Sequence, residues 1–249
     1  MTCMKEEDAT LEVYNASSPP AHIYHFDPAD PSSLPPKTPG YTRFIPPGDV
    51  LLHAGDLSSY GYPSQLQLTL DWLASLPIPR NGNHDLCLDK NLTLADQRVL
   101  EEQRMCSAEL KSKGIHYLEH ESLTITVPSG RAWKLYGSPA AARYAIGAFQ
   151  YKNAHEAQEI YDRIPADTEI LLTHTPPYCV HDKTRRGVDA GCAVLARRME
   201  TLPSCRLHVF GHIHEACGAS MNKEGRVSVN AALSHAHRRV YVVDLQDHS

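Results

Sequence analysis

The sequence predicts an α/β fold in which helices pack on a mixed β-sheet. Short apolar runs of five or six residues occur along the chain and are typical of buried strands. Between several of these runs lie longer segments whose apolar residues follow a helical spacing. One pair of segments alternates apolar and polar residues around a Pro-Ser-Gly turn, which indicates an antiparallel hairpin. Strands that alternate with helices, joined by one hairpin, favour layers of helix and sheet.

The first part of the chain differs in character from the rest. Nine of the eighteen prolines fall within residues 19–47, a density that excludes regular helix and disfavours central strands. We therefore expect residues 1–40 to form an irregular arm and residues 41–249 to form one folded domain. Residues 50–54 are a short apolar run that ends at Gly-Asp, which suits a buried parallel strand.

The remaining elements follow in order. Helices are predicted at residues 63–76 and 94–113, the second ending at Gly114. The hairpin comprises residues 123–127 and 132–136. In the last part of the chain, the pattern of apolar residues predicts two helices and four strands. The helices lie at 154–163 and 192–200, and the strands at 169–173, 206–210, 226–230 and 239–244.

Composition narrows the possible partners and locations. Lys and Arg number 24 against 29 Asp and Glu, a net charge of −5, which argues against a nucleic-acid partner. Seven scattered cysteines form no Cys-x-x-Cys pair, so we expect reduced thiols. The first thirty residues lack the apolar core of a signal peptide, and no window approaches the ~20 apolar residues that span a bilayer. We expect a cytoplasmic protein without membrane association, with the nucleus as the alternative.

Polar side chains with metal-binding chemistry follow several of the predicted strands. Asp56 follows the first strand, His174 follows strand 169–173, and His212 and His214 follow strand 206–210. Asn83 and His84 lie in a loop that begins with glycine. Ligands at the carboxyl ends of neighbouring strands converge on one crevice. A set of Asp, Asn and His suits Mn²⁺, Fe, Zn²⁺ or Ni²⁺ better than Ca²⁺.

Each motif also has an ordinary structural explanation. A lone Gly-Asp is more often a turn, and Gly-Asn alone is a common loop signal. For His212 and His214 a structural role is the less favoured interpretation, because residues two apart on an extended strand point to the same side.

Four ordered motifs give the chain its family resemblance. Segments 55–61, 82–85, 172–177 and 209–214 resemble those of the calcineurin-like metallophosphoesterase superfamily, and within it the small metallophosphoesterase-domain-containing subgroup. The resemblance spans residues 41–244. It implies a four-layer αββα sandwich with mixed sheets.

The resemblance also implies roles for individual residues. Asp56 would bridge two metal ions, Asn83, His174 and His212 would complete the second site, and His214 would serve the first. His84 would contact the phosphate and protonate the leaving alkoxide. Two ions ~3.5–4 Å apart would clamp the phosphoryl oxygens and activate water.

The chain departs from the family pattern at its opening strand. Family members begin with a strand that ends in Asp-x-His, whereas here Phe44 is followed at once by the lead-in to the next strand. One site therefore keeps Asp56, Asn83, His174 and His212, and the other keeps only Asp56 and His214. The prolines within residues 76–81 predict the loss of a second central strand, and so reduced stability.

The predicted function is metal-dependent hydrolysis of phosphomonoesters or phosphodiesters, with a small phosphoester or nucleotide as substrate. We expect one retained divalent ion instead of the family's two, and weakened turnover. The alternative is a non-catalytic binding module that keeps one metal; a third possibility is a splice form of a complete enzyme. Residues 138–150 and 179–190 are the loops expected to select leaving groups. Oligomeric state stays open.

Overall fold

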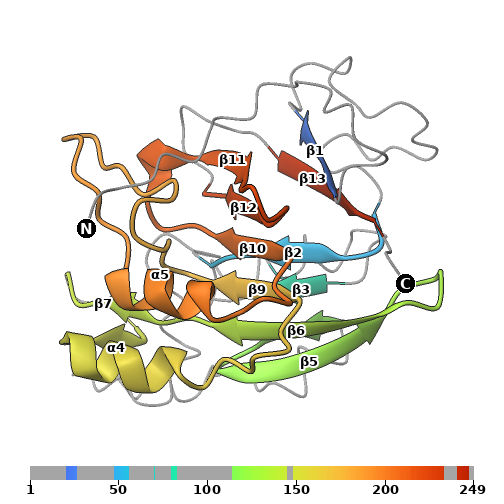
Figure 1. Ribbon diagram of the computed structural model, residues 1–249, viewed down its shortest axis with the longest axis horizontal. Coiled ribbons are helices and arrows are strands. Elements are labelled where there is room, and N and C mark those ends of the chain that lie inside the picture. The colour runs from blue at the N-terminus through green and yellow to red at the C-terminus, as the bar shows by residue number, and fades with distance from the viewer. Residues whose placement is uncertain are drawn as a thin grey trace.

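A mixed six-stranded sheet forms the centre of the protein (Figure 1). The computed structural model describes residues 21–26, 48–55, 70, 80–82, 114–144, 148–232 and 240–246. In spatial order the strands are β11 (Gly218–Met221), β12 (Val227–Asn230), β10 (Leu207–Phe210), β9 (Ile170–Thr173), β6 (Ala132–Ser138) and β5 (Glu121–Thr126). The four inner strands are parallel, and each edge strand is antiparallel to its neighbour. This arrangement confirms the predicted mixed sheet.

Two helices cover one face of this sheet. Helix α4 (Ala154–Tyr161) connects β6 to β9, and α5 (Ala193–Glu200) connects β9 to β10. Parallel neighbours joined through a helix are the βαβ unit that the alternating sequence pattern predicts. Tyr161, Leu171 and Leu195 lie in the hydrophobic core between the helices and the sheet, and none is more than 1% exposed.

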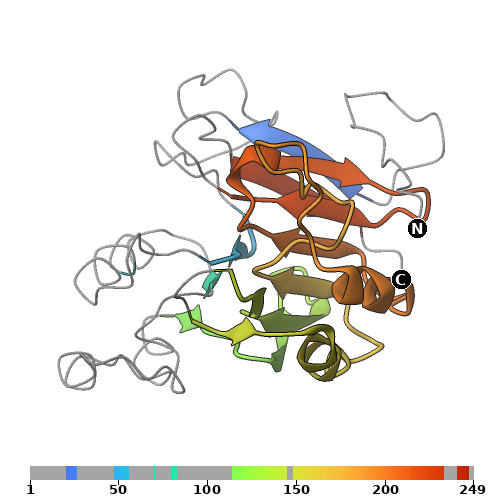
Figure 2. The same cartoon turned by 90° about the vertical axis from the view of Figure 1, so that its left-hand side faces the viewer.

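The opposite face packs against further strands, as Figure 2 shows from the side. Leu135, Leu172 and Val209 are buried there, and Leu52 and Val243 pack against them. A second sheet comprises β2 (Leu51–His53), β3 (Arg80–Gly82) and β4 (Ile115–His116), all parallel. Strands β13 (Val240–Leu245), β1 (Ala21–Phe26), β7 (Ala141–Ala142) and β8 (Gln150–Tyr151) form two further pairs.

The sandwich thus has a helix layer and two sheet layers within the described residues. The predicted helices 63–76 and 94–113 lie outside them, except that Leu70 is helical and only 1% exposed. Within the described ranges, no helix has the length and apolar character needed to cross a membrane.

Two expectations about proline-rich segments were wrong. The arm at residues 1–40 is not irregular throughout, because β1 pairs antiparallel with β13 along its whole length. Its six residues contain no proline; the prolines lie on either side. Likewise, β3 is the middle strand of its sheet although prolines precede it. It begins directly after Pro79, so no proline removes a hydrogen bond inside the strand.

Five further short elements were not predicted. They are the strands β4, β7, β8 and β11 and the 3-10 helix η3 (His214–Ala216). Strands of two residues contain too little sequence to show a periodicity. The sequence of β11, Gly-Ala-Ser-Met, has no β-branched residue that would indicate a strand.

Candidate metal centre

Two of the predicted ligands meet at the carboxyl ends of β9 and β10. These strands are parallel neighbours, and His174 directly follows β9 while His212 lies two residues beyond β10. The Nδ1 of His212 is 3.0 Å from the Nε2 of His174. Their rings are 4.7 Å apart at an interplanar angle of 65°. The prediction that strand ends bring these two histidines together is therefore confirmed.

The His174 ring is held in a single orientation. Its Nδ1 lies 2.9 Å from the carbonyl oxygen of Ala54, which follows β2. Because a carbonyl only accepts, Nδ1 carries the proton and Nε2 presents its lone pair towards His212. Backbone hydrogen bonds from His174 N to Ser138 O and from Gly211 N to His174 O fix the residue on both sides. An imidazole anchored through one nitrogen to a carbonyl is the usual support for a metal ligand.

The spacing of the two nitrogens fits a divalent ion. Nitrogen ligands lie about 2.1 Å from such ions, and adjacent ligands in octahedral coordination are then about 3.0 Å apart. The observed 3.0 Å between His212 Nδ1 and His174 Nε2 matches this spacing. In the part of the chain that the structure describes, no group of three or more His, Cys, Asp or Glu side chains forms a cluster. Within the described residues, the candidate site therefore consists of the histidine pair alone.

Two other predicted ligands, Asp56 and Asn83, lie outside the described residues, as does the predicted catalytic residue His84. Asp56 comes three residues after His53, the end of β2, and Asn83 comes directly after Gly82, the end of β3. The two strands are parallel, with His53 opposite Gly82 in the register. The roles of Asp56, Asn83 and His84 stay predictions.

His214 does not share the geometry of His212. It begins η3 and its side chain is exposed. The expectation that both residues point to the same side of an extended strand was wrong, because β10 ends at Phe210. His212 then adopts a left-handed φ of 68°, and the amide of Ile213 hydrogen-bonds to the carbonyl of Gly211 at 2.8 Å. The chain is turning, so the two-residue period no longer applies.

Asn230 supports this turn and was not singled out from the sequence. It is the last residue of β12 and has 0% exposure. Its Nδ2 donates to the carbonyl oxygens of Ile213 and His181, each at 2.9 Å, and its Oδ1 accepts from the amide of Ala232. The rule that located the histidines, a polar residue at the carboxyl end of a buried strand, also applies to this position.

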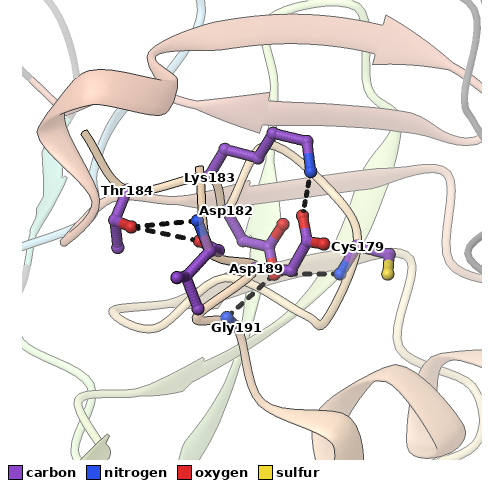
Figure 3. Close-up of polar contacts among 7 residues, drawn as sticks. Cys179, Asp182, Lys183, Thr184, Asp189 and Gly191 are labelled. Carbon is purple, nitrogen blue, oxygen red and sulfur yellow. Dashed lines mark hydrogen bonds and ion pairs between the residues drawn. The ribbon is translucent and has the colours of Figure 1, made fainter. Parts of the chain in front are cut away.

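A compact loop, residues 177–191, lies between β9 and α5 (Figure 3). The carboxylate of Asp182 is 1% exposed and accepts from the amides of Cys179 at 2.9 Å and Gly191 at 2.8 Å. Burial raises the pKa of Asp182, although the hydrogen bonds from the backbone amides of Gly191 and Cys179 act to lower it. An ion pair of 2.6 Å joins Lys183 to Asp189 further along the loop. The loop predicted to select leaving groups is thus an ordered unit.

The cysteines differ in state. Cys192, Cys205 and Cys217 are free thiols, as expected. Cys179 is disulfide-bonded. The expectation of reduced thiols throughout was therefore wrong at Cys179.

Comparison with known proteins supports the family resemblance of the four sequence motifs. The family model described as calcineurin-like phosphoesterase matches residues 36–216. The human metallophosphoesterase domain-containing protein 1 is 31% identical over 229 residues, which cover 80% of this chain and 68% of that protein.

Two further matches are less informative. A probable rhamnogalacturonate lyase C of Emericella nidulans is 36% identical over 70% of this chain, but the match spans only 16% of that protein. The solved structure of a phosphopantetheinyl hydrolase from Mycobacterium tuberculosis covers 77% of this chain and 81% of its own at 12% identity, with a TM-score of 0.43. That score is too low to support any conclusion about function.

Proposed function

Because the chain belongs to the calcineurin-like phosphoesterase family, we propose that it hydrolyses phosphomonoesters or phosphodiesters with metal-activated water. The observation that supports this most directly is the histidine pair, with His212 Nδ1 3.0 Å from His174 Nε2. In this proposal one divalent ion is held by these two histidines together with Asp56 and Asn83.

The bound ion, His174 and His84 would each have a different role in hydrolysis. A bound divalent ion would neutralise phosphoryl charge and lower the pKa of water. His174 would hold its lone pair in place through its Nδ1–H bond to Ala54 O. As water oxygen bonds to phosphorus and the bond from phosphorus to the leaving oxygen breaks, His84 would give that oxygen a proton.

The first metal site of the family is depleted in this chain. The sequence contains no Asp-x-His, which leaves Asp56 and His214 for that site. The exposure of His214 agrees with a site that no longer encloses an ion. We therefore expect one ion per chain and weak turnover. The same observations favour a second candidate function, a non-catalytic module that retains one metal.

Net charge and ligand type support proposals for the substrate class and the metal. A net charge of −5 argues against a nucleic-acid substrate, so a small phosphoester or nucleotide is proposed. Imidazole, amide and carboxylate ligands accept Mn²⁺, Fe, Zn²⁺ or Ni²⁺. The proposed location is the cytoplasm, with the nucleus as the alternative.

Metal content and hydrolysis of an aryl phosphodiester in Mn²⁺ test these candidates together. We expect one ion per chain and measurable, slow turnover. The variant His212→Asn removes the imidazole while keeping a residue type that tolerates a left-handed φ. His212→Asn should lose both the bound ion and the turnover. His84→Ala should lose the turnover but keep the ion.

A matched control is His155→Ala, because His155 lies on α4 with a side chain that is 83% exposed. It should behave as the wild type. One retained ion without any turnover would leave the binding module as the function. Turnover that survives His212→Asn would contradict the metal site itself.

A further inference from the structure

We propose that Asn230 is a positioning residue that fixes the His212 turn to the loop 177–191, so that the metal ligand and the loop shift together. The inference rests on the proposed metal site for its consequences, but its geometry stands on the described residues alone. Asn230 ends β12, one strand away from the histidine pair.

The side-chain amide of Asn230 joins three segments. Its two N–H groups donate to Ile213 O and His181 O, each at 2.9 Å, and its oxygen accepts from Ala232 N at 3.0 Å. The side chain is fully buried. An alanine here would leave the two carbonyls without these donors in the interior, where unpaired polar groups are costly.

Both carbonyls belong to strained segments. His181 has a left-handed φ of 43°, and its own carbonyl is one of the two acceptors. His212, with φ 68°, immediately precedes the other acceptor, Ile213. Left-handed conformations at residues other than glycine persist where surrounding contacts hold them. The side-chain amide of Asn230 therefore binds next to both left-handed residues and is one of the contacts that hold them.

The contact at His181 continues into the loop. Its Nε2 is 2.9 Å from the hydroxyl of Ser220 on β11, and the ring packs so closely on Gly218 that a Cβ there would lie 2.7 Å from Nδ1. Asp182, the next residue, holds the amides of Cys179 and Gly191. A displacement of His181 would therefore move Asp182 and, through its hydrogen bonds, Cys179 and Gly191 near the two ends of the loop 177–191.

The test compares Asn230→Ala with a matched control, Asn222→Ala. Asn222 holds the turn at the other end of β12, where its Oδ1 accepts from Arg226 N at 2.8 Å. We expect Asn230→Ala to raise the dissociation constant for Mn²⁺ about tenfold or more, as loss of a supporting contact does at metal sites. Asn222→Ala should leave that constant unchanged even if it lowers stability.

A second measurement requires no metal. Imidazole ¹⁵N spectra of the metal-free protein report the hydrogen bond between His212 Nδ1 and His174 Nε2. We expect this signature to be lost in Asn230→Ala and retained in Asn222→Ala. If the spectra of Asn230→Ala match those of the wild type, the inference is wrong. If the wild type binds no Mn²⁺, the proposed function fails, and these spectra still decide the role of Asn230.

A third measurement uses only the wild type and so does not depend on the variant folding. Coupling between two sites is reciprocal, so an ion at the His212 turn should also stabilise the loop. Saturation with Mn²⁺ should slow hydrogen exchange at the amides of Cys179 and Gly191, which Asp182 binds. Unchanged exchange at both amides on saturation would overturn the inference.

Discussion

At the scale of single residues, His208 shows how burial fixes a side chain's charge. It lies on β10 with 0% exposure, and its Nε2 is 2.8 Å from the hydroxyl of Thr173. That hydroxyl already donates to Thr175 O at 2.8 Å, so His208 Nε2 must donate. Burial, with a smaller effect from Arg226, lowers the pKa of His208 to about 3. The residue therefore stays neutral in the folded protein.

This shift predicts an acid-sensitive stability. The unfolded chain binds a proton at His208 below pH ~6.5, whereas the folded protein does so only near pH 3. The contribution of neutral His208 to the free energy of unfolding is therefore fully present above pH ~6.5. It falls by up to about 1.4 kcal/mol per pH unit as the pH drops towards 3. His208→Gln, which cannot titrate, should flatten this decline in urea unfolding measured from pH 7 to 4.

His120 acts in the same direction. Burial, with a smaller effect from Arg163, lowers its pKa to about 4, so it should preserve part of the acid dependence in His208→Gln. Exposed His155 supplies a control whose substitution by Gln should leave the slope unchanged. An unaltered slope in His208→Gln would contradict the assignment of a neutral buried imidazole.

Gly191 makes a second prediction at this scale. A Cβ at this position would lie 2.4 Å from Pro177 O and 2.8 Å from the Asp182 carboxylate. Because the nearest atom is backbone, Gly191→Ala should distort the loop and lower the free energy of unfolding by about 1–3 kcal/mol. Gly48→Ala is the control, since nothing lies within 4 Å of a Cβ there. Equal stability of the two variants by chemical denaturation would exclude the predicted clash.

At the scale of elements, the first turn of α4 depends on its cap. Asn153 precedes the helix with extended backbone angles, and its side-chain oxygen accepts from the amides of His155 and Glu156, both at 3.0 Å. Tyr161 at the other end is fully buried against the sheet. The cap therefore begins a helix whose position the core then fixes.

Removing this cap should have a modest and specific cost. Asn153→Ala should lower the free energy of unfolding by about 1 kcal/mol, and Asn153→Asp should largely preserve it, because aspartate also caps helices. Thermal and urea unfolding of both variants measure this difference. A cost in Asn153→Asp equal to that in Asn153→Ala would show that the capping oxygen is not the cause.

At the scale of the whole molecule, the inner strands β9, β10 and β12 are fully buried, and the carboxyl ends of β9 and β10 lead to the proposed metal site. Helices α4 and α5 cover one face, and strands including β2 and β13 pack on the other. The site draws on both faces, since Ala54 O after β2 holds a histidine that follows β9. Metal binding should therefore stabilise the fold as a unit.

That linkage gives a direct measurement. Mn²⁺ at about 100 times its Kd should stabilise the protein by about 2.7 kcal/mol, since it binds the folded state alone. For a chain of 249 residues this corresponds to a rise in Tm of about 5–10 °C. Removal of the ion with a chelator should reverse the shift. His212→Asn should show no shift, and a shift that persists in this variant would place the ion elsewhere.

Much of the fold could be predicted because its elements are long enough to show a period. The strands and helices from β5 onward were located within a few residues, and the histidines at the ends of β9 and β10 were found by the same reasoning. The short strands β7, β8 and β11 were missed, and η3 replaced an expected extended segment. There Gly211 and a left-handed His212 turn the chain, which an apolar pattern does not reveal.

The sequence by itself determined which chemical groups the proposed site contains, because ligand type and strand-end position are local properties of the chain. Only the tertiary structure decided that His212 faces His174 across 3.0 Å while His214 is exposed. It also revealed that Asn230 and Ala54 support this geometry from distant strands. Such contacts join residues far apart in sequence, and they form only when the packed sheet brings the strand ends together.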